Sequence, residues 1–127
     1  MRVFDEITLN GWPDVAAAET FASRLVGMMG RKDVADGEGL WFPRCSSVHM
    51  KFMSCPLDIV AIDREGVVVG CDTVAPWQKV PRRPGTASVL EVQAGSAASL
   101  GIGPGARLLA EGPGSEAFPK GGRRHDS

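Results

Sequence analysis

The chain lacks several features that mark membrane-spanning, secreted or metal-dependent proteins. No apolar run reaches about 18 residues, the length that a spanning helix needs, and the opening MRVFDEITLNGW is too polar for a secretory signal. The three cysteines, Cys45, Cys55 and Cys71, cannot all pair with one another, and none lies in a Cys-x-x-Cys motif. We therefore expect reduced thiols in a cytoplasmic protein, with no metal site and no cofactor.

An excess of charge of one sign is also missing. The 127 residues include 14 Lys and Arg against 15 Asp and Glu, and no internal repeat is present. A net charge near zero argues against nucleic acid or an anionic membrane as the partner. The 43% of apolar residues suits one globular domain. We expect that domain over residues 1–110, followed by a flexible, Gly- and Pro-rich tail over residues 111–127.

The pattern of apolar and turn residues predicts an α+β domain that is mainly antiparallel β. The segment Val15–Met29 is rich in helix-forming residues, its apolar residues recur at helical spacing, and Gly30 can end it, so it is the expected main helix. We expect the strands to form a small, partly closed β-barrel with this helix over one opening. Strands are expected at Val3–Leu9, Gly39–Phe42, Val48–Met53, on both sides of the turn Asp63–Gly66, at Ser88–Gly95 and at Gly105–Ala110, with one short helical turn from Ser96.

One long irregular segment interrupts this pattern. The stretch APWQKVPRRPGTA, residues 75–87, holds three prolines and a glycine, and long loops in small domains often carry function. Trp77 in this loop would either pack down as a lid or offer a stacking surface. Its cations Lys79, Arg82 and Arg83 would either be solvated or meet an anionic ligand.

Asp58 is a carboxylate on an apolar strand face, shared with Val60 and Ile62. Burying it alone would cost several kcal/mol, so it must be paired or hydrogen-bonded. In a structural interpretation, Asp58 accepts backbone N–H groups of the turn around Pro56. In a functional interpretation, it belongs to an acid/base pair with His49 or is a polar anchor in a pocket.

Two further titratable residues lie inside predicted strands. His49 would point away from the apolar face of its strand, either into a pocket or simply to solvent. Glu91 would face solvent or form an ion pair with Arg24 or Arg107. No G-x-S-x-G motif accompanies them, so a nucleophile is not indicated.

Five motifs in order along the chain resemble those of the uncharacterised family called domain of unknown function 192. They are SRLVGMMGR (Ser23–Arg31), GLWFP (Gly39–Pro43), HMKFM (His49–Met53), PLDIVAIDREG (Pro56–Gly66) and VLEVQAG (Val89–Gly95). The likeness spans about residues 15 to 110. It implies a compact, mostly β fold with one or two short helices, and it implies no established reaction.

We interpret the chain as a binding module with a shallow cleft for an unknown small ligand or protein partner. The alternative is a small hydrolase-like enzyme with His49 as general base, oriented by Asp58. In either case we predict that Trp77 lies near His49 on one concave surface, with Asp58 beneath it. The residues expected to line the cleft are Trp41, His49, Met53, Asp58, Trp77 and Glu91.

Overall fold

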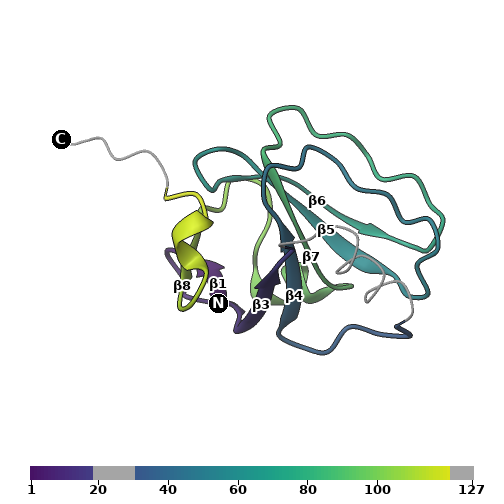
Figure 1. The fold of residues 1–127 in the computed structure, drawn as a ribbon, viewed down its shortest axis with the longest axis horizontal. Coiled ribbons are helices and arrows are strands. Elements are labelled where there is room, and N and C mark those ends of the chain that lie inside the picture. Colours follow the sequence, from purple (N-terminus) through teal and green to yellow (C-terminus); the bar gives the residue numbers. More distant parts are fainter. Residues whose placement is uncertain (19–30, 121–127) are drawn as a thin grey trace.

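The computed structural model describes residues 1–18 and 31–120. Their strands form two sheets, mostly antiparallel, accompanied by one short helix. Along the chain the elements are β1 (Arg2–Asp5), β2 (Gly11–Trp12), β3 (Asp14–Ala17), β4 (Glu38–Phe42), β5 (Leu57–Ile62), β6 (Val68–Val74), β7 (Ser88–Gln93), α2 (Ser96–Leu100), β8 (Leu108–Glu111) and a 3₁₀ turn at Ser115–Ala117. Figure 1 shows β1 and β8 of the smaller sheet on the left and the strands of the larger sheet to their right.

The larger sheet has the strand order β3-β4-β7-β5-β6, and the smaller one has the order β2-β1-β8. Only β3 and β4 pair in parallel; the other pairs of the described strands are antiparallel. These pairings give two sheets, and no closed barrel is found among the described strands, for which we expected a partly closed one. No helix among the described residues combines the length and the apolar character needed to cross a membrane.

The prediction of a helix from Val15 is wrong at its start. Residues Asp14–Ala17 form β3, in which Val15 pairs with Gly39 and Ala17 with Trp41. Pairing with β4 outweighs the helical preference of alanine, because propensity is a weak prior beside tertiary contacts. Residues 19–29 of the expected helix lie outside the described part of the chain.

The central strands of the larger sheet, β5 and β7, are buried on both faces. All six residues of β5 are buried, and their side chains alternate between two apolar clusters. The first cluster lies between the sheets and includes Val60, Ile62 and Leu90. The second lies on the opposite face and includes Leu57 and Ile59. Side chains that join different clusters therefore lie on opposite faces of the sheet and cannot belong to the same site.

Phe118 completes the first cluster from a part of the chain that we expected to be a flexible tail. Its side chain is buried, and its ring centroid lies 5.0 Å from that of Trp41. The 3₁₀ turn before it and the backbone bond from Phe118 N–H to Ser115 C=O hold it in place. Part of the expected tail thus packs on the domain, while residues 121–127 lie outside the described residues.

Candidate functional site

Two long connections lie side by side and carry the candidate site. Residues 43–56 join β4 to β5, and residues 75–87 join β6 to β7. The Cys45 N–H donates to the Ala87 carbonyl at 3.0 Å, and the Trp77 N–H donates to the Met50 carbonyl at 2.9 Å. In Figure 1 both loops run from the larger sheet to the end of the molecule opposite the small sheet. We call them the paired loops.

An arginine fastens the second of the paired loops to the sheet. Arg83 donates from Nε and Nη2 to the two carboxylate oxygens of Asp72 in β6, at 3.1 and 2.5 Å. Its side chain crosses Gly70, where an added Cβ would lie 2.4 Å from the Arg83 Cγ. Glycine at position 70 therefore lets the arginine lie flat on β6, and the two-point ion pair fixes the loop.

Two methionines fasten the first of the paired loops. Met50 and Met53 are buried in the second cluster, whereas Lys51 and Phe52 between them are exposed. The strand that we predicted at Val48–Met53 is absent, because Phe52 adopts a left-handed backbone with φ of 66°, which breaks the alternation. The turn presents the Lys51 and Phe52 side chains outward.

His49 and Trp77 meet at one concave surface between the paired loops, a cavity of about 410 Å³. This size is within the range of small-molecule sites. Three cations, Lys51, Lys79 and Arg82, line it together with His49, and none of the lining residues that the structure describes is a carboxylate. The full lining comprises Ser47, Val48, His49, Met50, Lys51, Trp77, Gln78, Lys79, Val80 and Arg82.

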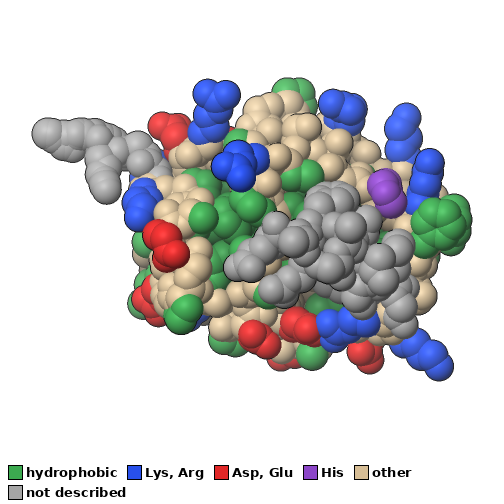
Figure 2. Space-filling view, viewed as in Figure 1, with side chains coloured by type: hydrophobic (Ala, Val, Ile, Leu, Met, Phe, Trp, Pro, Cys, Tyr) green, Lys and Arg blue, Asp and Glu red, His purple; other side chains and the backbone are tan. Residues whose placement is uncertain are grey.

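The hydrogen bond of the His49 ring decides what the ring offers to this cavity. Its Nδ1 accepts the Lys51 N–H at 3.2 Å. In the neutral ring the proton then resides on Nε2, which makes that nitrogen a donor. Figure 2 shows blue Lys and Arg side chains close to a purple histidine side chain. The cavity therefore presents donors and positive charge.

Asp58 serves the fold and not this cavity. Its Oδ1 accepts the Thr73 hydroxyl at 2.6 Å and the Gly95 N–H at 3.0 Å, and its Oδ2 accepts the Ala97 N–H at 3.1 Å. It thus joins β5 to β6 and to the start of α2. The turn around Pro56 that we expected to supply the donors does not do so.

The expected pairing of His49 with Asp58 is not found. Asp58 lies on the same face of β5 as Val60, toward the cluster between the sheets. Met50, next to His49, inserts into the cluster on the opposite face. The sheet separates the two side chains, and the hydrogen bonds found for the Asp58 carboxylate go to other groups. The geometry offers no general base oriented by this carboxylate.

The other expected cleft residues are buried in the core. Trp41 joins the cluster between the sheets, and Met53 joins the opposite one. Glu91 is 1% exposed, which corrects the expectation that it faces solvent, and its Oε1 has no hydrogen-bond partner among the described residues. Burial raises the pKa of Glu91 to about 7. Of the six predicted residues, the cavity thus holds His49 and Trp77.

The cysteines offer no activated thiolate. Burial is the main cause that raises the pKa of Cys45, Cys55 and Cys71, the last to about 11. The Cys45 thiol donates to the Ser47 carbonyl at 3.0 Å and not to His49. Within residues 1–18 and 31–120, no group of three His, Cys, Asp or Glu side chains could hold a metal ion.

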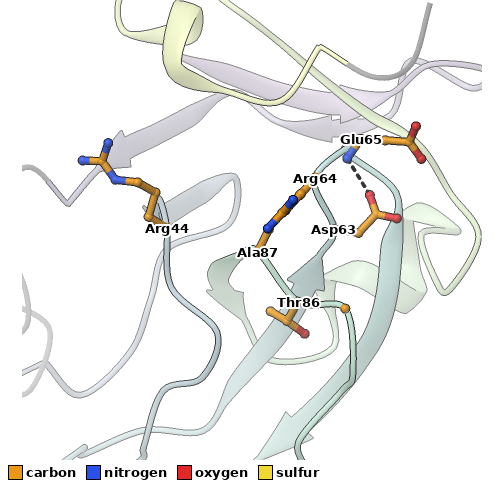
Figure 3. Close-up of a pocket in the computed structure, with 7 residues that line it drawn as sticks. Arg44, Asp63, Arg64, Glu65, Thr86 and Ala87 are labelled. Atoms are coloured by element: carbon orange, nitrogen blue, oxygen red, sulfur yellow. Dashed lines mark hydrogen bonds between the residues drawn. The ribbon is translucent and has the colours of Figure 1, made fainter.

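A second hollow, of about 720 Å³, lies beside the turn between β5 and β6. Figure 3 shows Arg64 close to Ala87, with Arg44 on the opposite side. Its charges are mixed, because Asp63 and Glu65 line it with the two arginines. The Asp63 Oδ1 accepts the Glu65 N–H at 2.8 Å and so braces the turn. Its lining is balanced in charge, which makes this hollow a weaker candidate than the cavity of the paired loops.

Charged residues are distributed unevenly along the chain, and our sequence-based predictions did not take this into account. Residues 43–56 and 75–87 hold five of the chain's lysines and arginines, and none of its aspartates and glutamates. The remainder of the chain is correspondingly acidic. This signal was readable in the sequence, but averaging over the whole chain hid it. Phe52 was missed as well, because it lies inside the strand that we predicted at Val48–Met53.

Comparisons with known proteins agree on the fold. The family model DUF192, described as Uncharacterized ACR, matches residues 6–110. A solved structure of a Novosphingobium aromaticivorans DSM 12444 protein of unknown function is 27% identical, with a TM-score of 0.70, and the match covers 86% of this chain and 82% of that one. A Sinorhizobium meliloti 1021 protein, provisionally described as a transcription regulator, is 26% identical, with a TM-score of 0.64 and coverage of 84% and 88%. None of the curated proteins matches this chain.

Proposed function

We propose that this chain, which belongs to the uncharacterised family DUF192, is a binding module that holds a small anionic ligand in the cavity of the paired loops. The observation that carries the proposal is the composition of the cavity wall. Lys51, Lys79, Arg82 and His49 line it, no carboxylate of the described residues does, and Trp77 adds an aromatic surface.

The charges of the wall favour an anion over a cation or a neutral ligand. Arg83, the remaining cation of the second loop, is engaged by Asp72, so it fixes the loop and does not compete for the ligand. Lys79 and Arg82 are exposed and carry no internal ion pair among the described residues. Charge-assisted hydrogen bonds to carboxylate or phosphate oxygens are about twice as strong as neutral ones.

The proposal is for binding and not for catalysis. The described residues present no activated thiolate and no carboxylate that orients His49, because Asp58 bonds to Thr73, Gly95 and Ala97. The cleft is also open at the surface, and chemistry at charged groups benefits from a site that excludes water. A ligand would rest on the loops and exchange freely with solvent.

Phenyl phosphate is a suitable probe, because it joins a planar ring to a phosphate group. We expect a titration followed by ¹H–¹⁵N NMR to shift the amides of residues 47–51 and 77–82 and the Trp77 indole N–H. The double variant Lys79→Gln, Arg82→Gln should weaken binding by about tenfold, which is about 1.4 kcal/mol. Benzyl alcohol, which has the ring without the charge, should bind much more weakly.

Arg64→Gln is the matched control, because Arg64 is an exposed arginine that lines the other hollow. This variant should bind phenyl phosphate like the parent protein. Shifts at Arg64 and Thr86 in place of residues 47–51 and 77–82 would move the site to the second hollow. Shifts that are absent at millimolar probe, or unchanged in the double variant, would refute the proposal.

A further inference from the structure

Phe52 and Trp77 form an exposed aromatic pair, with one residue from each of the paired loops. The Phe52 and Trp77 rings pack edge to face with centroids 4.8 Å apart, yet each side chain remains 61% exposed. The two residues come from different loops, and Phe52 does not line the cavity. Large exposed apolar side chains that lie side by side mark interaction surfaces more often than scattered ones do.

The backbone holds both rings outward at a cost. Phe52 has φ of 66° and Trp77 has φ of 68°, a left-handed conformation that is unfavourable for bulky residues. Met50 anchors the arrangement, because its side chain is buried and its carbonyl accepts the Trp77 N–H. Strain of this kind persists only where the surroundings enforce it, and it gathers at functional sites. Two strained, exposed aromatic residues in contact therefore point to a partner for the pair.

Positive charge surrounds the aromatic pair. Lys51 precedes Phe52, and Lys79 follows Trp77 by two residues, while the paired loops contain no carboxylate. Figure 2 shows a green hydrophobic side chain at one extremity of the molecule with blue side chains next to it. The acidic residues belong to the rest of the chain, so an anionic surface would attract this end and repel the others.

We propose that the Phe52–Trp77 pair docks the protein onto the surface of an anionic lipid bilayer. Aromatic rings partition to the headgroup level of a bilayer, and lysines beside them meet the negative surface potential. A bilayer suits a protruding apolar tip with a cationic rim. Docking of this kind is peripheral and needs no spanning helix. It goes beyond the binding of a small anion in the neighbouring cavity.

Vesicle binding tests this inference directly. We expect the protein to sediment with phosphatidylcholine vesicles that contain about 30 mol% phosphatidylserine, and not with pure phosphatidylcholine. Raising the salt from about 0.1 M to about 1 M shortens the screening length from about 10 Å to about 3 Å and should release the protein. Brominated lipids should quench the fluorescence of Trp77 and not that of Trp12 and Trp41, which are buried. The quenching should therefore be absent in Trp77→Phe.

Variants locate the contact. Trp77→Ala and Phe52→Ala should each reduce vesicle partitioning at least fivefold, and Lys51→Gln with Lys79→Gln should do the same. The control Ile7→Ala removes a side chain that is 85% exposed in the turn between β1 and β2, and it should bind like the parent. These residues are exposed, so circular dichroism should show each variant folded.

Several outcomes would overturn the inference. Equal binding to neutral vesicles, or equal binding by Ile7→Ala and Trp77→Ala, would remove the aromatic pair as the anchor. Binding to a single-stranded oligonucleotide without binding to anionic vesicles would assign the surface to nucleic acid instead. The phenyl phosphate titration distinguishes the two proposals, because Phe52→Ala should leave that affinity unchanged while it weakens vesicle binding.

Discussion

Replacing Glu91 with glutamine should remove most of the dependence of stability on pH between about pH 5 and about pH 7. Glu91 lies in β7 on the face of the second cluster, where it pairs in register with Leu40 of β4 and Ile59 of β5. Burial disfavours the charged carboxylate and raises its pKa from 4.5 to about 7. The unfolded chain exposes the same group to water, where its pKa returns to the ordinary value.

The sign of the effect follows from which state keeps the proton. Below pH 4.5 both states are protonated, and Glu91 contributes no dependence on pH. Between pH 4.5 and about 7 the unfolded chain loses the proton while the folded protein retains it, so stability falls as pH rises. At about 1.36 kcal/mol per pH unit, the wild-type protein should lose about 3 kcal/mol over this window. Above it, this contribution becomes constant.

Urea unfolding at a series of pH values measures the effect. Glu91→Gln cannot ionise, so its unfolding free energy should match that of the wild type near pH 4.5 and exceed it by up to about 3 kcal/mol at pH 8. Glu65→Gln, at an exposed carboxylate, should retain the wild-type slope. Parallel pH profiles of wild type and Glu91→Gln, or wild-type stability that rises with pH across the window, would refute the reasoning.

Two further changes test the contacts that hold the fold. Asp58→Ala should lower the unfolding free energy by about 3 kcal/mol in urea titrations, because it leaves the Gly95 and Ala97 amides without their acceptor. Asp58→Asn should lower it less, since the asparagine side chain keeps one oxygen. Equal stability of all three proteins would show that Asp58 does not brace α2. Phe118→Ala should lower the unfolding free energy by about 3 kcal/mol in the same assay, because the Phe118 side chain is 2% exposed and its ring packs on Trp41. An unchanged unfolding midpoint would show that this segment does not stabilise the domain.

The sequence predicted those elements whose signals are local. The hairpin of β5 and β6 turns at Asp63–Gly66, where the Asp63 carboxylate accepts two backbone N–H groups and Gly66 has positive φ. The helical turn from Ser96 became α2. Each of these depends on residues within a few positions of one another, which is the range that sequence patterns report.

The failures share a non-local cause. Residues Asp14–Ala17 become a strand because β4, more than twenty residues later, supplies the hydrogen bonds. The segment around Phe52 fails to form a strand because it bonds to the Trp77 loop instead of a neighbouring strand. Alternation along β5 placed Asp58 correctly beside Val60, yet it could not reveal that His49 would lie on the other side of the sheet.

The candidate site shows why a whole-chain average can mislead about partners. The net charge of the whole chain is −1, which suggests no preference for a charged partner. The fold nevertheless brings together two loops that contain lysines and arginines and lack carboxylates. Screening in physiological salt confines electrostatic attraction to about 8 Å, so a partner that meets the loop tip senses the loops and not the distant acidic residues. The local arrangement of Lys51, Lys79 and Arg82 around Trp77 therefore determines what this end of the protein can bind.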